Sequence, residues 1–415
     1  MKATVKRLAV IALGLALGAC GSSSDSDDSS AFSTQEALGE SLFNDTSLSF
    51  NRTQACSSCH DSAKAFTDSN LDDEGNTVAV SLGDDGVSTG DRNAPTATYA
   101  TLTPEFQNGT RTRFNSQQSD YSGWIGGQFH DGRASTLADQ AGGPFLNEIE
   151  MGMPNKASVI ERILENDQYV EAFERLFGSD VFDDTDTAYT ALTEAIAAFE
   201  STDEFMPFDS KYDRSLLDED DPDYYDYGVI SKVASGRTLF FSQQFTNCAT
   251  CHQLKRQGSA NETFTGYEYH NIGVPVNSAV RTANGLGTDY VDTGLQTNNE
   301  AVTDASEMGK FKVPTLRNVA ITAPYMHNGV FQDLATVVKF YDHWMTGSSH
   351  TINPETGIEW ADPEVTDTIS LTELQDGALI TDTRVEQLVC FMMTLTDARY
   401  ESLISDEDWE NCEAE

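Results

Sequence analysis

Two copies of the pentapeptide Cys-x-x-Cys-His are the residues whose type and spacing point most directly to chemistry. Their members are Cys56, Cys59, His60, Cys248, Cys251 and His252. In this pattern two thiols reach the vinyl groups of a haem and form thioether bonds, and the adjacent imidazole binds the iron. The sequence therefore predicts two covalently bound c-type haems.

Two other uses of such cysteine pairs fit this sequence less well than haem attachment. Pairs that share one zinc ion usually lie about 15–20 residues apart, whereas these two motifs are separated by almost half the chain. A redox-active dithiol does not require the histidine that follows each pair here. Both alternatives are therefore weaker than the haem interpretation.

The N-terminus predicts export. Lys2, Lys6 and Arg7 precede a short apolar run at 8–17, which is too short to span a bilayer. The run ends in Leu-Gly-Ala-Cys20, which resembles a bacterial lipoprotein box, where the signal is cut before the cysteine and the thiol is lipidated. We expect 1–19 to be a lipoprotein signal peptide, 20–33 a disordered tether and the remainder a periplasmic body on a lipid anchor. The alternative is an ordinary secretory signal cut near Ala19, with Cys20 as a free thiol.

Cys390 and Cys412 are the cysteines left over from these assignments. An oxidising compartment permits them to form a disulfide. Two unpaired thiols are the other possibility.

The charge balance excludes several partners. The 415 residues contain 25 Lys and Arg against 67 Asp and Glu, a formal charge of −42. Binding to nucleic acid or to anionic lipid needs clustered basic residues, so we expect no nucleic acid partner and membrane contact only through the lipid anchor. With 39% hydrophobic residues the chain can still build cores. A donor protein with a basic face would be attracted.

Hydrophobic spacing predicts a mainly α fold. Helices are expected at 34–44, 155–177, 187–200, 229–241, 331–341 and 384–395, with a long loop at about 71–123 and an acidic linker at 217–227. Each half has the order helix, haem motif, helix. We therefore expect two cytochrome c-like haem domains with long irregular loops, at 34–216 and 217–415.

Several separate segments carry a more specific resemblance. They are Asp91-Arg-Asn-Ala-Pro-Thr96, Asp131-Gly-Arg-Ala134, Glu150-Met-Gly-Met153, Phe311-Lys-Val-Pro-Thr-Leu-Arg-Asn-Val319 and Ala323-Pro-Tyr-Met-His-Asn-Gly329. With the haem motifs, these segments resemble the bacterial dihaem cytochrome c peroxidase family, which includes the MauG-like enzymes. The similarity covers roughly 34–395.

The resemblance implies a role for each haem. The N-terminal haem would be the peroxidatic one, and the C-terminal haem would collect electrons. Glu150 matches the family's pocket glutamate, and Gln140 matches a pocket amide. Splitting hydrogen peroxide needs a group that takes a proton from one oxygen and delivers it to the other, which a carboxylate can do. The plainer interpretation of Glu150 is a helix-capping carboxylate.

The resemblance also implies further ligands. The family places a Met, or in MauG-like members a Tyr, opposite the proximal histidine of the second haem, and Met326 fills the matching place. Met308, Tyr325 and His327 remain alternatives. A calcium ion between the haems would be held by the Asn93 side chain and by backbone carbonyls near Glu307 and Gly309. Otherwise Asn93 simply makes a turn before Pro95.

The chain departs from the family pattern at two places. His130 stands where many members have a Trp between the haems, so electron transfer would use tunnelling or another aromatic residue such as Trp124. The family's peroxidases also carry a His that caps the first iron, but no His lies between His60 and His130. We therefore expect an N-terminal iron that is open to peroxide at rest, unless His130 folds back onto it.

Three functions follow. The first is a periplasmic peroxidase that reduces hydrogen peroxide to water with electrons from a small cytochrome c or cupredoxin. The alternative is a MauG-like enzyme that uses peroxide to oxidise residues of a partner protein. A dihaem electron carrier is the third, although it would need neither Glu150 nor Gln140. The resemblance also makes a homodimer possible.

Overall fold

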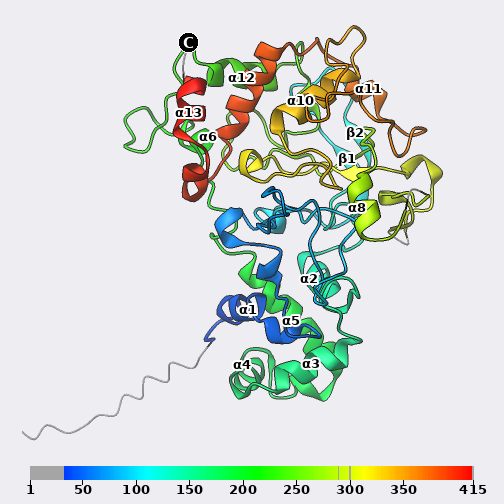
Figure 1. Ribbon diagram of the computed structural model, residues 1–415. Coiled ribbons are helices and arrows are strands. Elements are labelled where there is room, and N and C mark those ends of the chain that lie inside the picture. The colour runs from blue at the N-terminus through cyan, green and yellow to red at the C-terminus, as the bar shows by residue number, and fades with distance from the viewer. Residues whose placement is uncertain (1–31, 288, 299–300, 414–415) are drawn as a thin grey trace, which may run out of the picture.

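The computed structural model describes residues 32–413 apart from 288 and 299–300, and shows two lobes built mainly from helices (Figure 1). The helices are α1 (Gln35–Phe43), α2 (Leu137–Leu146), α3 (Lys156–Leu164), α4 (Asp167–Phe177), α5 (Thr185–Phe199), α6 (Lys211–Arg214), α7 (Lys232–Phe240), α8 (Ser278–Ala283), α9 (Leu295–Asn298), α10 (Leu334–His343), α11 (Leu371–Leu374), α12 (Asp382–Met393) and α13 (Asp406–Glu413). The strands form two small antiparallel sheets, β1 (Gln107–Arg111) with β2 (Tyr121–Ile125) and β3 (Tyr269–His270) with β4 (Phe311–Lys312). The expected mainly α fold is confirmed.

The lower lobe is organised by the crossing of α1 and α5. Thr34 caps α1 by accepting a hydrogen bond from the backbone N–H of Ala37. At the crossing, a Cβ atom on Gly39 would lie only 1.9 Å from the carbonyl oxygen of Ala195. The two backbones can approach this closely only because Gly39 has no side chain. Phe43 and Phe199 pack beside the crossing at 5.4 Å between ring centroids.

The upper lobe repeats this crossing with α7 and α12. A Cβ atom on Gly236 would lie 1.8 Å from the carbonyl oxygen of Gln387. The shift from Ala195 to Gln387 is 192 positions (387 − 195), the same as from Cys56 to Cys248 (248 − 56). Each haem motif is therefore framed by the same pair of helices, as an internal duplication predicts.

One predicted helix is wrong in extent. The segment 155–177 is not one continuous helix, because the helical conformation is interrupted between α3 and α4. Asn166 lies at the break in an extended conformation, and its side chain accepts a hydrogen bond from the backbone N–H of Gln168. This N-cap starts a new helix. The other predicted helices agree with α1, α5, α7, α10 and α12 to within a few residues.

The prediction of a loop over the whole of 71–123 is wrong toward its C-terminal end, where β1 and β2 form a hairpin that reaches across to the C-terminal half. Strands β1 and β2 lie in the upper lobe, beside elements from the second half of the chain (Figure 1). Trp124 of β2 stacks on Phe106 with 4.8 Å between ring centroids, and both pack against Tyr269. The N-terminal half thus supplies part of the surroundings of the second haem motif.

A disulfide joins the last two helices. Cys390 on α12 and Cys412 on α13 are bonded at 1.97 Å, so the pairing of these two cysteines is confirmed over the alternative of free thiols. Among the described residues no helix has both the length and the apolar content to cross a membrane. The predicted signal peptide at 1–19, lipidation at Cys20 and the tether up to residue 31 lie outside the described residues.

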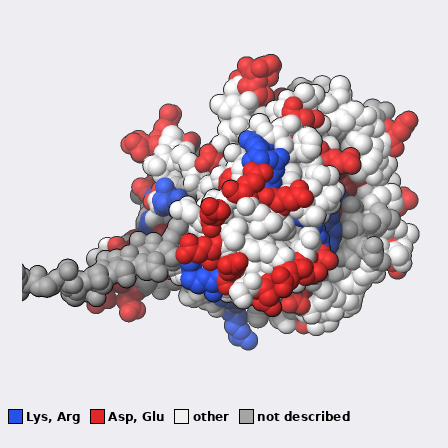
Figure 2. All heavy atoms as spheres, turned by 90° about the horizontal axis from the view of Figure 1, so that it is seen from below, with Lys and Arg blue, Asp and Glu red and all other residues white. Residues whose placement is uncertain are grey.

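The surface reflects the composition. Figure 2 shows the underside of the lower lobe, where acidic side chains are spread widely and basic ones are fewer. Several basic groups of the described chain are paired with acidic ones, such as Arg52 with Glu165 at 2.7 Å and Lys156 with Asp186 at 2.6 Å. The net negative charge is therefore exposed to solvent and available to steer charged partners.

Candidate haem and peroxide sites

The first haem motif holds its histidine in one orientation. Residues Cys56–Ser58 form a single 3₁₀ turn, and the backbone N–H of His60 donates to the carbonyl oxygen of Cys56 at 2.9 Å. The Nδ1 atom of His60 lies 2.9 Å from the carbonyl oxygen of Phe66. This bond fixes the tautomer and leaves Nε2 as the nitrogen for an iron. Burial lowers the pKa of His60, which keeps the imidazole neutral and able to bind a metal.

The second motif has the same two hydrogen bonds at its histidine as the first. The backbone N–H of His252 donates to the carbonyl oxygen of Cys248 at 2.9 Å, and Nδ1 of His252 lies 3.2 Å from the carbonyl oxygen of Phe264. Burial lowers the pKa of His252 to about 4. Phe66 and Phe264 both have φ near +53°, which turns each carbonyl toward its histidine. Both motifs therefore fit the attachment of a haem.

A large cavity beside the second motif brings together residues from both halves. Its walls include Cys248, Cys251, His252, Met326, Tyr341, Met392, His130 and Asn93. The predicted ligand Met326 thus lies in the haem cavity, whereas Met308 does not line it. Tyr325 also lines it, but its hydroxyl donates to the carbonyl oxygen of Val319 at 2.9 Å.

Tyr341 is a cavity residue that sequence reasoning missed. Its side chain is half-buried, and desolvation together with the nearby thiols of Cys251 and Cys248 raises its pKa. No described residue forms a hydrogen bond with its hydroxyl. Met326, by contrast, packs into an apolar cluster with Phe331 and Phe340. The signal in the sequence was a tyrosine at the end of the predicted helix 331–341, in a family where a Tyr can replace the Met ligand.

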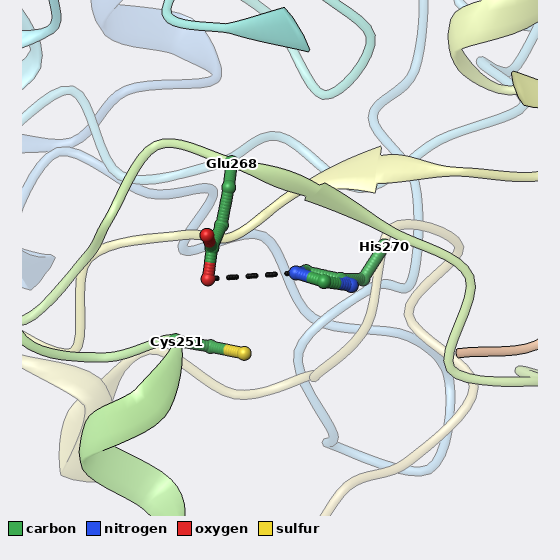
Figure 3. Close-up of side chains that lie close together, drawn as sticks. All are labelled: Cys251, Glu268 and His270. Carbon is green, nitrogen blue, oxygen red and sulfur yellow. Dashed lines mark ion pairs between the residues drawn. The ribbon is translucent and has the colours of Figure 1, made fainter. Parts of the chain in front are cut away.

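A trio of polar side chains lies against the second motif. Figure 3 shows the Cys251 thiol facing Glu268 and His270, with 3.4 Å between a carboxylate oxygen of Glu268 and Nε2 of His270. These groups are close enough together to hold a metal ion. The carboxylate is already neutralised, however, because Arg111 binds it at 2.9 Å and Arg113 at 3.5 Å.

Arg111 and Arg113 explain why the carboxyl group of Glu268 is ionised. Burial alone would raise the pKa of Glu268, but His270, Arg111 and Arg113 outweigh it and lower the pKa to about 2. Arg111 also donates to the carbonyl oxygen of Gln253 at 2.6 Å and to that of Thr250 at 2.5 Å. The trio is therefore part of an ion-pair network that anchors the β1–β2 hairpin to the haem motif, rather than a separate metal site.

Glu150, the glutamate that the resemblance singles out, lies near the first motif. The Nδ2 atom of Asn147 donates to Oε1 of Glu150 at 2.7 Å, which orients the carboxyl group. Burial raises the pKa of Glu150, against smaller opposing effects from Arg133 and Asn147. The carboxylate is close enough to Cys56 and Cys59 to act on both thiols electrostatically. A raised pKa makes the carboxylate a stronger base, as a group that takes a proton from a bound molecule needs to be.

Asp84 ties the Glu150 segment to the chain that leads into the first motif. Its backbone N–H donates to the carbonyl oxygen of Glu150 at 2.7 Å. Its carboxylate accepts hydrogen bonds from the hydroxyls of Ser49 at 2.6 Å and Thr53 at 2.7 Å. Gln140 is the fourth residue of α2, and no hydrogen bond joins its amide to Glu150 in the described structure.

The wall between the two haem regions contains His130. Its Nε2 atom lies 2.9 Å from the carbonyl oxygen of Asn93, and burial lowers its pKa to about 4. Bonded in this way, His130 is held in the wall and is neutral. Trp124 packs in the apolar cluster of Phe106 and Tyr269 and does not line the cavity.

The residues predicted for calcium are brought together only in part. Asn93 and Gly309 line the same cavity, and Glu307 does not. The Asn93 amide donates to the carbonyl oxygen of Ala79 at 3.1 Å, which leaves its own side-chain oxygen for a ligand. Glu307 pairs with Lys310 at 3.1 Å, and its carbonyl oxygen accepts from the Lys310 N–H at 3.3 Å.

Two haem motifs, a half-buried glutamate beside the first and a shared cavity beside the second define a dihaem oxidoreductase. Residues 33–221 match the family model described as di-haem cytochrome c peroxidase. The chain is 48% identical over 372 residues to the methylamine utilization protein MauG of Paracoccus denitrificans, covering 89% of this chain and 90% of that protein. The chain belongs to the di-haem cytochrome c peroxidase and MauG family.

Other relatives in this family are named as peroxidases. The cytochrome c551 peroxidase of Nitrosomonas europaea is 30% identical over 70% of this chain and 68% of that protein. The crystal structure of the diheme peroxidase BthA from Burkholderia thailandensis superposes with a TM-score of 0.74 at 29% identity, covering 91% of this chain and 89% of that one. The family implies two haem c groups and an oxidoreductase activity for this chain.

Proposed function

We propose that this protein is a MauG-like dihaem enzyme that uses hydrogen peroxide to oxidise residues of a partner protein. The observation that carries the proposal is the Tyr341 phenol in the cavity of the second motif, close to both of its thiols and without a hydrogen-bond partner in the described structure. The identity to MauG over most of both chains supports it. In this reading each half is a cytochrome c-type haem domain, and bound haem supplies the redox chemistry.

Tyr341 would be the sixth ligand of the C-terminal haem, in place of Met326. A thioether ligand raises the reduction potential of a haem, which suits a site that receives electrons from a donor. A phenolate is anionic and stabilises the oxidised iron instead, which suits a site that holds oxidising equivalents for a partner. The packing of Met326 among Phe331 and Phe340 supports the same assignment.

Glu150 would transfer a proton between the two oxygens of the peroxide. Asn147 occupies Oε1, so Oε2 is the oxygen that takes the proton from one end of the peroxide and returns it to the leaving oxygen. Gln140 on α2 would hold the peroxide by its amide. The bond from His130 to Asn93 supports an N-terminal iron with His60 as its one protein ligand, open to peroxide at rest.

A peroxidase that draws electrons from a small cytochrome c or cupredoxin is the second candidate function. His130 favours it, because an imidazole is harder to oxidise than the indole that many family members have at this place. In this candidate the exposed negative charge would attract a donor with a basic face. The location would be periplasmic on a lipid anchor at Cys20, and a homodimer is possible in either case.

We also propose one calcium ion between the two haem regions. Asn93 and Gly309 would supply a side-chain and a backbone oxygen, and waters would complete the shell. The Glu307 carbonyl is the weakest of the proposed ligands, because it already accepts a hydrogen bond.

An assay of the haem-loaded protein separates the two functions. Hydrogen peroxide is added to the oxidised protein, first without a donor and then with a reduced basic cytochrome c. We expect a change in haem absorbance that persists without the donor and only slow oxidation of the cytochrome. Fast turnover of the cytochrome, together with loss of that turnover in Glu150→Gln, would establish the peroxidase instead.

A further inference from the structure

Glu200 is a buried carboxyl group that the proposed mechanism does not use. It follows the last residue of α5, and its backbone N–H donates to the carbonyl oxygen of Ile196 at 3.0 Å. The residue is 5% exposed, and its Oε2 atom has no hydrogen-bond partner in the described structure. Burial raises the pKa of Glu200 to about 8. A buried carboxyl group without partners is costly, so its presence needs a reason.

The internal duplication identifies the residue of the second half that corresponds to Glu200. The shift of 192 positions that relates Ala195 to Gln387 also relates Phe199 to Phe391, and both phenylalanines contact the glycine of their helix crossing. By the same shift, Glu200 corresponds to Met392, which lines the cavity of the second motif. Glu200 therefore holds, in the first half, the position that in the second half lines the cavity beside the haem motif.

An independent observation agrees with this placement. Glu200 acts on the Cys56 thiol electrostatically, and this effect is the largest on that thiol after burial. The other ionisable groups near the first motif are Glu150, which acts on both thiols, and Asp68, which acts on Cys59 and His60. No Lys or Arg of the described chain pairs with Glu200, so a haem on Cys56 would bring the nearest positive charge.

We propose that Glu200 is a redox-linked proton site of the N-terminal haem. Its carboxylate gains one proton from solvent when the iron gains one electron, and the carboxylic acid releases that proton when the electron leaves. The electron comes from the enzyme's electron donor, or from an electrode in the test below. The physical reason is that reduction removes a positive charge beside a carboxylate that has no other partner, so the neutral acid becomes the stable form. This inference needs only the haem on Cys56 and not the proposed activity toward a partner.

The test is a spectroelectrochemical titration of the haem-loaded protein at a series of pH values around 8, without peroxide. In the unmodified protein, the equilibrium constant for reducing the N-terminal haem should fall about tenfold for each unit by which the pH rises. This fall corresponds to a decrease of about 59 mV in the reduction potential. Glu200→Gln and Glu200→Met should both remove this dependence. The second variant copies the residue found at Met392, so it keeps the fold testable if the first loads haem poorly.

Glu194→Gln is the matched control, because Glu194 is exposed on the same helix. It should keep the pH dependence of the unmodified protein, and all variants should keep the potential of the C-terminal haem. An unchanged pH dependence in both Glu200 variants would overturn the proposal, as would a flat potential in the unmodified protein. Either result would leave the proposed peroxide chemistry untouched.

Discussion

The Nδ1 atom of His60 lies 2.9 Å from the backbone carbonyl oxygen of Phe66, and this bond fixes which nitrogen can meet an iron. The corresponding distance from His252 to Phe264 is 3.2 Å. Such a bond also makes the metal-facing nitrogen more basic. Both haem motifs thus hold their histidine in the same way, so the different roles proposed for the two haems would come from other groups, chiefly Glu150 at the first and Tyr341 at the second.

Glu150→Gln should reduce peroxide consumption by about 10²- to 10⁴-fold, because the amide cannot take and return the proton. The variant should keep both haems and their spectra. The measurement is the rate of peroxide loss with the haem-loaded protein. Glu148→Gln, at an exposed neighbour, is the control and should be nearly unaffected. An active Glu150→Gln enzyme would show that another group moves the proton.

Asn147→Ala should shift the acid side of the pH profile. Burial raises the pKa of Glu150, and the hydrogen bond from Asn147 partly offsets this by stabilising the carboxylate. Removal of the amide raises the pKa further, so activity that needs the ionised base is lost at a higher pH as the pH falls. The profile of kcat/KM against pH measures this shift. A shift toward lower pH would contradict the assigned role of Asn147.

Tyr341→Phe should change the spin state of the C-terminal haem. Loss of the phenol removes the proposed sixth ligand, so the low-spin signal in the electron paramagnetic resonance spectrum should be replaced by a high-spin one. Met326→Leu is the comparison variant and should leave the spectrum unchanged. If the effects of the two substitutions are reversed, Met326 is the ligand and the peroxidase function gains support.

Gly39→Ala and Gly236→Ala should each destabilise the fold by about 2 kcal/mol or more, because the added methyl group meets a backbone carbonyl oxygen that cannot move aside. Denaturant unfolding of the haem-loaded protein measures the loss. Gly90→Ala is the control, since its nearest contact would be an ordinary 3.6 Å. Equal stability of all three variants would mean that the helices can separate without cost.

Local patterns in the sequence were sufficient for some features and not for others. The haem motifs and most helices depend on short-range spacing, and the residues around Cys56 and His252 lie as that spacing predicts. The hairpin at 107–125 could not be placed, because its contacts with Glu268 and Gln253 join distant segments through buried charges. The break at Asn166 depends on a single capping residue, which helical periodicity does not detect.

Tyr341 and Glu200 were missed for related reasons. Tyr341 reads as one more apolar position on a helix, and only the cavity shows that its phenol faces the second motif. Glu200 reads as a polar helix end, and only the structure shows that it is buried beside Cys56. His350 is likewise buried, and its Nδ1 atom lies 2.8 Å from a carboxylate oxygen of Asp342, a contact that helical spacing does not reveal.

The most direct test of the central claim is the iron coordination of both haems in the oxidised protein, measured by electron paramagnetic resonance together with resonance Raman spectroscopy. The account predicts one high-spin haem whose one protein ligand is His60, and one low-spin haem bound by His252 and Tyr341. Two low-spin haems, with His130 on the first iron, would contradict it. Met326 in place of Tyr341 on the second iron would contradict it as well.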